Sequence, residues 1–576
     1  MILIMYIKLQ LFCLFLSVPC FISLGFCDPI FSSNEIFQPV IAQSGMVASD
    51  NKLATEAGLK VLRDGGNAID AAVTVGFTMA VTSPRAGNIG GGGFMLIYLA
   101  DTKKVVSIDY REKAPKAATR KMFLDEYGNV DSEKSRHSYL AVGVPGTVAG
   151  LSLALQKYGT ISIDKALKPA IKYAEDGIPL DYELKNSLLS VKDRMKNSPD
   201  AYHTFFKENG ESYEIGEKII QKDLAWSLKQ IKNDGMDAFY KGNISKKIVT
   251  DMKENGGLIT YDDLSSYRPV IRKPVYGTYR GYEIYSMPPP SSGGIHLIQM
   301  LNILEHYPIN KLGHNYSKTI HIMAEAMKLV YADRSKFLGD SDFVSVPIKQ
   351  LTSKKYAKSL SKNIDLQKAT PSSTIKPGNP YNSGGNDTTH FTVMDRIGNV
   401  VSNTYTINFS YGSNIVAKGT GILLNNEMDD FSAKPGVPNA YGLIGGQYNA
   451  VEPEKRMLSS MSPTIVLKDG KPFLATGSPG GSRIITTVLQ IISNVIDHNM
   501  NIASATASPR FHHQWLPDII RLEKGFSTDT INILKNKGHK IKVGRAMGST
   551  QSIMKHGDYY YGYSDPRRAG GLTKGY

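Results

Sequence analysis

The chain has 576 residues, of which 67 are Lys or Arg and 52 are Asp or Glu, giving a formal charge of +15. Hydrophobic residues make up 41% and charged residues 21%, which excludes global disorder and is enough for a large packed core. The length suggests about three or four domains, or one large mixed core. The basic residues are scattered, with no dense arm or aromatic platform, which favours a solvated surface over nucleic-acid binding.

All three cysteines lie within the first 27 residues. This stretch carries one charge, Lys8, followed by the apolar run 9–27, and it predicts a secretory signal peptide that is cleaved before Asp28. The alternative is an uncleaved membrane anchor, because roughly 18 apolar residues can just span a bilayer. Removal of the leader would leave no cysteine, which excludes disulfides, thiolate zinc sites and a Cys nucleophile.

Two helices are predicted early in the mature chain, at 54–63 and 68–81, the second of them buried. A glycine-rich loop at 87–93 and a strand at 94–99 follow. A phosphate-binding loop needs the order strand, glycines, helix, so the reversed order here argues against a nucleotide site. Another apolar helix is expected from about Ile295.

The segment 372–386 is rich in Ser, Gly, Pro and Asn, and it predicts an exposed loop or a segment that becomes a chain terminus. Two β-rich runs follow, joined by a turn at Ile397–Gly398. Residue numbers in such a hairpin sum to about 795, which places Thr388 opposite Thr406 or Ile407 and close to Asn408. Taken alone, this pattern also fits an ordinary surface hairpin.

Three further segments stand out downstream. The run 421–431 is an apolar strand that ends in polar and acidic residues, and 434–446 has the character of a lid loop. A strand at 465–467 precedes the run 477–483, which enters a helix near Ile484. Adjacent glycines before a helix can present the free N–H groups of an oxyanion hole, or can simply form a tight turn.

Five motifs together resemble the γ-glutamyltransferase family (γ-glutamyl transpeptidases, or glutathione hydrolases). The resemblance spans the chain from 65–71 to the C-terminal residues 564–567 and 575–576. The motifs occur in the family's order, at 387–390 (DTTH), 406–408 (TIN), 425–432 (NNEMDDFS), 458–464 (LSSMSPT) and 477–482 (GSPGGS).

The resemblance implies an N-terminal-nucleophile hydrolase of α/β (α+β) class, a four-layer αββα sandwich with two stacked sheets between helical layers. The precursor would cut itself between Asp387 and Thr388, giving a heterodimer of a large subunit (28–387) and a small catalytic subunit (388–576). The new amine of Thr388 would act as general base for its own hydroxyl. No cofactor or metal is implied.

The resemblance also assigns the reacting groups. Thr406 would hydrogen-bond the nucleophile Thr388, and the N–H groups of Gly480 and Gly481 would stabilise the oxyanion. Tyr441 would be the lid that screens the pocket.

The remaining assignments concern the two ends of the γ-glutamyl group. Arg111 would hold its α-carboxylate, a role suited to a bidentate guanidinium, with added hydrogen bonds from Ser459 and Ser460. Its ammonium end would be bound by Asn408, Glu427 and Asp430. Members of the family carry either Gln or Glu at position 427.

The function implied is transfer of the γ-glutamyl group of glutathione and related compounds, through an ester on Thr388, to water or to amino acid and peptide acceptors. The alternatives are a related N-terminal-Thr amidase (a β-lactam side-chain acylase or a poly-γ-glutamate depolymerase) or an unprocessed binding protein. A glycan at the Asn408 sequon would block the pocket, which favours a bacterial periplasm-like compartment.

Two other features allow structural interpretations. His512 and His513 are adjacent, so their side chains point to opposite faces of a strand, and we expect packing near Trp515 instead of metal binding. Asp333 and Arg334 are predicted to form an internal ion pair.

Overall fold

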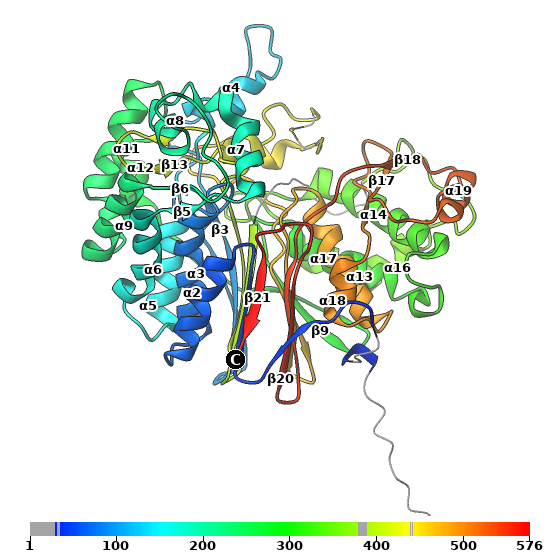
Figure 1. Cartoon of the computed structure of the whole chain (residues 1–576). Coiled ribbons are helices and arrows are strands. Elements are labelled where there is room, and N and C mark those ends of the chain that lie inside the picture. Colours follow the sequence, from blue (N-terminus) through cyan, green and yellow to red (C-terminus); the bar gives the residue numbers. More distant parts are fainter. Residues whose placement is uncertain (1–28, 32–34, 378–388, 438, 441) are drawn as a thin grey trace, which may run out of the picture.

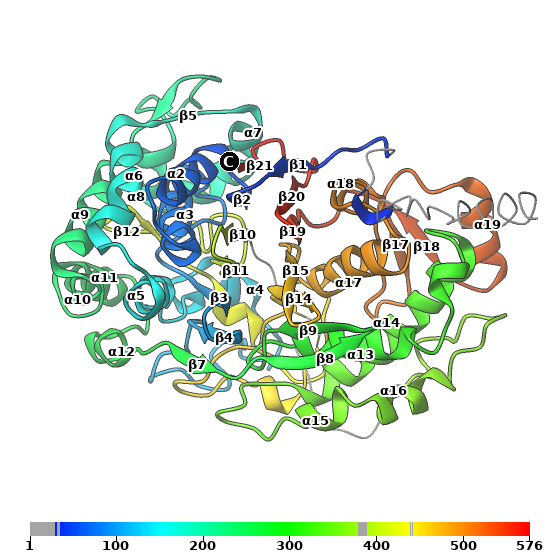
Figure 2. The same cartoon turned by 90° about the horizontal axis from the view of Figure 1, so that it is seen from below.

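The computed structural model describes residues 29–31, 35–377, 389–437, 439–440 and 442–576. Two seven-stranded sheets form its centre, and helices cover the outer side of each (Figure 1). Figure 2 shows the same two helical groups on either side of the strands, seen from below. The predicted four-layer αββα sandwich is therefore confirmed.

The first sheet carries the predicted hairpin at its centre, and all its strand pairs are antiparallel. Its central strands are buried from end to end, because side chains on one face meet helices and those on the other face meet the second sheet. Its order is β21 (Leu572–Gly575), β2 (Gly45–Ser49), β10 (Thr389–Asp395), β11 (Val400–Thr406), β3 (Gly92–Leu99), β4 (Lys104–Asp109) and β7 (Val270–Arg272).

The second sheet is also antiparallel throughout. Met46, Leu96, Ile465, Ala475 and Ile553 are among the buried side chains that fill the space between the sheets. Its order is β1 (Val40–Ala42), β20 (Tyr559–Ser564), β19 (Gln551–His556), β15 (Lys471–Thr476), β14 (Thr464–Lys468), β9 (Tyr282–Ser286) and β8 (Val275–Tyr279). Short strands outside the two sheets are β5 (Ile178–Pro179), β6 (Lys218–Ile219), β12 (Val416–Ala417), β13 (Ile422–Leu423), β16 (Phe511–His512), β17 (Ile520–Leu522) and β18 (Ile541–Val543).

The helices outside the first sheet include both of those predicted early in the chain. Asn67 caps α3 (Ala68–Thr82) in a capping box with Asp70, and every residue of this helix is buried. The others on this side are α2 (Lys52–Arg63), α4 (Ser132–His137), α5 (Thr147–Tyr158), α6 (Ile163–Asp176), α7 (Tyr182–Met195), α8 (Pro199–Phe205), α9 (Lys222–Asp234), α10 (Asp237–Tyr240), α11 (Asn243–Glu254) and α12 (Tyr261–Ser266).

The helices outside the second sheet surround the buried, apolar α13 (Gly293–Leu304), which begins two residues before its predicted start. The others are α14 (Ser317–Phe337), α15 (Ile348–Leu351), α16 (Lys354–Ser361), α17 (Arg483–Ile496), α18 (Ile502–Ala507) and α19 (Thr528–Asn536). Among the described residues, no helix is both long and apolar enough to cross a membrane.

Candidate active site

The predicted hairpin is confirmed over its described residues. Thr389 pairs with Tyr405 and His390 with Thr404, so paired residue numbers sum to 794, one less than expected. Thr406 ends β11 and lies beside Gly92 of β3. The expected cleavage residues Asp387 and Thr388, and the expected lid residue Tyr441, lie outside the described residues.

A tight corner follows the end of β11. The backbone N–H of Asn408 donates to Thr406 Oγ1 over 2.7 Å, and Asn408 Nδ2 donates to the carbonyl of Asn426 over 2.9 Å. Asn408 has a φ of +72°, a left-handed conformation that Asn tolerates better than most residues. The corner thus brings Thr406 and Asn408 together, as predicted, and ties both to the loop that carries Glu427.

The glycine-rich loop that precedes β3 packs against this corner and hydrogen-bonds to it. Asn88 Nδ2 donates to the carbonyl of Thr406 over 2.9 Å, and Asn88 Oδ1 accepts from Gly91 N–H over 2.9 Å. A Cβ at Gly91 would overlap the same Thr406 carbonyl oxygen. The glycines therefore permit a close approach of two backbones, which is consistent with the sequence argument against a nucleotide loop.

A buried charge cluster surrounds Arg111, which follows β4. Its Nη1 lies 2.7 Å from Glu427 Oε2, its Nη2 pairs with Asp430, and its Nε donates to the carbonyl of Met457 over 3.2 Å. Glu112 Oε2 lies 3.5 Å from Nη1. All four charged side chains are fully buried. One guanidinium therefore faces three carboxylates.

The carboxylates of this cluster have raised pKa values. Burial is the main cause for Glu112 and Asp430, and the neighbouring Glu427 adds to it, so both pKa values lie well above the usual range. Burial also raises the pKa of Glu427, although Arg111 opposes it. Among the described residues, Glu112 Oε1 and Asp430 Oδ1 have no hydrogen-bond partner. The excess of buried negative charge favours a cationic ligand group such as an ammonium.

Ser459 and Ser460 lie on the loop before β14, held by the start of α13. Ser292 N–H and Oγ both donate to the carbonyl of Ser459 over 2.8 Å. Arg334 Nη2 donates to Ser460 Oγ over 2.8 Å, and Arg334 Nε donates to Ser292 Oγ over 3.1 Å.

The predicted ion pair between Asp333 and Arg334 is wrong. Neighbouring residues on a helix point about 100° apart, so the two side chains reach different partners. Asp333 Oδ2 accepts from Gln299 and Tyr356 over 2.6 and 2.9 Å, while Arg334 turns to the serines. Burial lowers the pKa of Arg334 to about 10, with Tyr331 opposing the shift.

Gly480 and Gly481 form the turn between β15 and α17. Their φ values are +133° and +61°, conformations that favour glycine. Their carbonyls accept from the N–H groups of Arg483 and Ile484, each over 3.1 Å, which begins the helix. In the described part of the chain neither glycine N–H has an acceptor, so both remain able to bind an oxyanion.

The candidate residues converge through shared contacts. Asn449 accepts from the N–H of Leu458 over 3.0 Å and donates to the carbonyl of Asp430 over 2.7 Å, which links the serine loop to the carboxylates. A cavity of about 580 Å³ is lined by both Asn408 and Gly480. Together with the ion pair of Arg111 and Asp430, these contacts bring residues more than 300 positions apart in the sequence into one region.

Two groups of histidines bear on metal binding. Trp515 N–H donates to His513 Nδ1 over 3.0 Å, consistent with the expected packing near Trp515. One described group could hold a metal ion: His321, Glu325 and His539, with ligand atoms within 4.8 Å of one another. Lys328 Nζ lies 2.8 Å from Glu325 Oε1, so an ammonium already occupies the cation position there.

The sequence matches the Gamma-glutamyltranspeptidase family profile over residues 54–574. The chain belongs to the γ-glutamyltranspeptidase family. The glutathione hydrolase proenzyme of Escherichia coli (strain K12) is 56% identical, with 94% of this chain and 93% of that protein aligned.

Solved structures agree with this assignment. The cephalosporin acylase of Bacillus halodurans has a TM-score of 0.83 at 28% identity, covering 93% of this chain and 97% of that one. A chain of the Helicobacter pylori γ-glutamyltranspeptidase has a TM-score of 0.57 at 49% identity, covering 60% of this chain and 97% of that one. The fold is therefore that of the N-terminal-nucleophile hydrolases.

Two charged residues that contact the candidate residues were not predicted from the sequence. Glu112 follows Arg111 directly and adds the third carboxylate. Arg334 was assigned to a local ion pair but instead contacts Ser460. In both cases the signal is the full burial of a charged side chain, which local sequence patterns do not report.

Proposed function

We propose that this chain is a self-processing γ-glutamyl acyl-transfer enzyme that cleaves the γ-glutamyl amide of glutathione and related compounds. The observation that carries the proposal is the buried cluster of Arg111, Glu112, Glu427 and Asp430. A γ-glutamyl group ends in a zwitterion, which needs both a guanidinium and an excess of carboxylates. The names of relatives, glutathione hydrolase proenzymes, support the same substrate class.

The nucleophile is Thr388, freed by self-cleavage after Asp387. The described pairing of β10 with β11 begins at Thr389 and Tyr405, so the described strand starts directly after position 388 in the sequence. The N-terminal amine of Thr388 takes the proton of its own hydroxyl while Oγ attacks the γ-carbonyl. The N–H groups of Gly480 and Gly481 stabilise the oxyanion, and the amine returns the proton to the leaving nitrogen. Water or an acceptor amine then attacks the ester and releases Thr388 Oγ.

The two ends of the donor are held apart. Arg111 offers its remaining Nη2 N–H to the α-carboxylate, because its other N–H groups contact Met457, the two glutamates and Asp430. These carboxylates, with the side chain of Asn408, bind the ammonium. Ser459 and Ser460 extend the carboxylate side, and Tyr441 serves as the lid.

The processed enzyme is a heterodimer of residues 28–387 and 388–576, exported by the leader 1–27 to a periplasm-like space. The leader acts as a cleaved signal peptide, with a retained anchor as the alternative. Support comes from the proenzyme names of relatives and from the Helicobacter pylori chain, nearly all of which aligns with 60% of this one.

A variant pair tests the nucleophile. Thr388→Ala removes the hydroxyl, and we expect a single uncut chain with no turnover of γ-glutamyl-p-nitroanilide. Thr388→Ser keeps the hydroxyl and should be cut and active at a reduced rate. Normal cleavage of the Ala variant, followed on a denaturing gel, would contradict the assignment.

A donor pair tests the substrate class against acylase chemistry. γ-Glutamyl-p-nitroanilide and glutaryl-p-nitroanilide differ only in the α-ammonium group. Contacts of that ammonium with Glu427 and Asp430 should favour the γ-glutamyl donor by about 100-fold or more in kcat/KM. Equal rates, or preference for the glutaryl donor, would instead indicate an acylase.

A further inference from the structure

The cavity that Asn408 and Gly480 line extends beyond the proposed γ-glutamyl pocket. Its volume is about 580 Å³, and four arginines contribute to its wall: Arg85, Arg483, Arg521 and Arg568. None of the described residues that line it carries a carboxylate. All four arginines are partly exposed, so the cavity is both cationic and accessible.

Two of these arginines are neutralised by neighbours. Arg85 Nη1 lies 2.9 Å from Glu183 Oε1, and Arg568 pairs with Asp50. Arg483 and Arg521 differ, because neither has an ion pair with any residue that the structure describes. The two uncompensated charges therefore belong to the wall next to Gly480.

Arg483 and Arg521 lie close enough to repel each other. Burial lowers the pKa of Arg521, and the positive charge of Arg483 lowers it further. Arg483 begins α17, three residues after Gly480, and Arg521 lies in β17, paired with His512 of β16. Two elements from different parts of the chain thus hold like charges together, an arrangement that a bound anion would stabilise.

We propose that Arg483 and Arg521 form a subsite for the free carboxylate of the leaving peptide and of the accepting amino acid or peptide. This inference rests on the proposed function. The γ-glutamyl half of the substrate occupies the acidic side of the site, around Arg111. The other half begins at the nitrogen of the scissile amide. The oxygen of that amide faces Gly480, which also lines the cationic cavity, so the leaving half enters this cavity.

The charge distribution therefore favours binding of the γ-glutamyl half on the acidic side and of the other half on the basic side. Leaving groups and acceptors of this reaction class are α-amino acids and short peptides, which end in a carboxylate a few bonds from the reacting nitrogen. A guanidinium pair can bind a carboxylate through charge-assisted, bidentate hydrogen bonds. The same carboxylate would be repelled by Glu112, Glu427 and Asp430, so binding in the reverse orientation is disfavoured.

The test uses the processed enzyme with γ-glutamyl-p-nitroanilide, whose leaving group has no carboxylate. Glycylglycine and glycylglycinamide serve as acceptors that differ only in the terminal carboxylate. We expect wild type to have a KM for glycylglycine roughly ten-fold lower than for the amide. Arg521→Gln and Arg483→Gln should each remove most of this ratio by raising the KM for glycylglycine.

Arg396→Gln is the matched control, because Arg396 is exposed at the turn of the β10–β11 hairpin and changes the net charge equally. It should preserve the wild-type ratio, and Arg521→Lys should restore part of it. An unchanged ratio in both Gln variants would overturn the subsite while leaving the proposed function intact. If wild type releases no nitroaniline at all, the proposed function fails and the subsite fails with it.

Discussion

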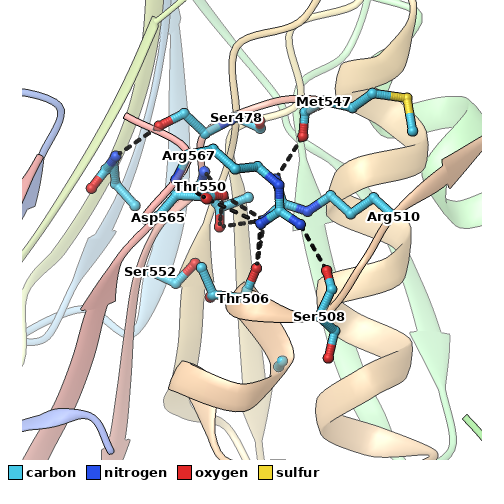
Figure 3. A network of polar contacts seen from close by, with 12 residues as sticks. Ser478, Thr506, Ser508, Arg510, Met547, Thr550, Ser552, Asp565 and Arg567 are labelled. Atoms are coloured by element: carbon cyan, nitrogen blue, oxygen red, sulfur yellow. Dashed lines mark hydrogen bonds and ion pairs between the residues drawn. The ribbon is translucent and has the colours of Figure 1, made fainter. Parts of the chain in front are cut away.

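Two buried arginine networks in this protein differ in charge balance. Figure 3 shows Arg510 and Arg567 beside Asp565, with Arg510 donating to the carbonyls of Thr506 and Met547 and Arg567 donating to the carbonyl of Ser508. Arg567 also contacts both oxygens of Glu523, at 2.8 and 2.5 Å. Two guanidiniums thus meet two carboxylates. Burial opposes ionisation of Asp565, but Arg510 and Arg567 outweigh it and lower its pKa.

The Arg111 cluster has the opposite character. One guanidinium meets three carboxylates, and the pKa values of Glu112, Glu427 and Asp430 are all raised. A balanced network contributes to the folded state by itself, whereas an unbalanced one lacks a charge that a ligand can supply. We therefore expect Arg510 to stabilise the fold, and the unbalanced charge around Arg111 is the basis for its proposed role in binding.

The largest effects are expected when Arg111 and Arg510 are each replaced by methionine. Arg111→Met should lower kcat/KM for γ-glutamyl-p-nitroanilide by roughly 10³-fold, because the donor carboxylate loses its charged partner. Its stability should fall little, since carboxylates with raised pKa values can accept protons. Arg510→Met should instead lower the free energy of unfolding by about 3–5 kcal/mol, because the buried Asp565 loses one of its two arginine partners. The measurement is a lower midpoint of urea unfolding.

The opposite results for the two variants would contradict this comparison. An Arg111→Met protein that retains kcat/KM but unfolds at much lower urea would make the cluster structural. An Arg510→Met protein with the stability of wild type would contradict the conclusion drawn from charge balance.

A smaller effect is expected at the turn between β15 and α17. Gly480→Ala places a Cβ at a φ of +133°, which forces the backbone to move and redirects the N–H. We expect kcat to fall about 10²-fold with KM within two-fold, as for loss of one oxyanion donor. Gly470→Ala is the matched control, at φ +72° in the β14–β15 turn with open space around it. Equal losses of kcat in both variants would indicate general backbone strain.

The smallest effect concerns pH. Since Glu427 contributes to the raised pKa values of Glu112 and Asp430, Glu427→Gln should lower both. In wild type these carboxylates lose charge, and ammonium binding weakens, as pH falls through their raised pKa values. The variant should therefore retain kcat/KM to lower pH, with a loss of roughly three- to ten-fold at neutral pH.

The control for this profile is Glu56→Gln, a carboxylate that is 49% exposed on α2. Its acid limb should coincide with that of wild type. An acid limb in Glu427→Gln that stays in place, or moves to higher pH, would contradict coupling within the cluster.

Local sequence patterns predicted the elements well where one rule dominates. The alternation around Ile397–Gly398 gave the hairpin within one residue of its register, and the apolar run at 68–81 gave a buried helix. The partners of buried charged side chains could not be predicted in this way. Arg334 bonds Ser460, 126 positions away, because the packing of α14 against α13 decides what a buried guanidinium meets. The proximity of Arg483 to Arg521, 38 positions away, is also set by packing and not by a local pattern.

The central claim is that cleavage before Thr388 creates the nucleophile, and intact mass with N-terminal sequencing of the purified wild-type protein tests it most directly. We predict two polypeptides, the smaller beginning Thr-Thr-His-Phe and spanning 388–576. A single polypeptide that nevertheless turns over γ-glutamyl-p-nitroanilide would contradict the claim.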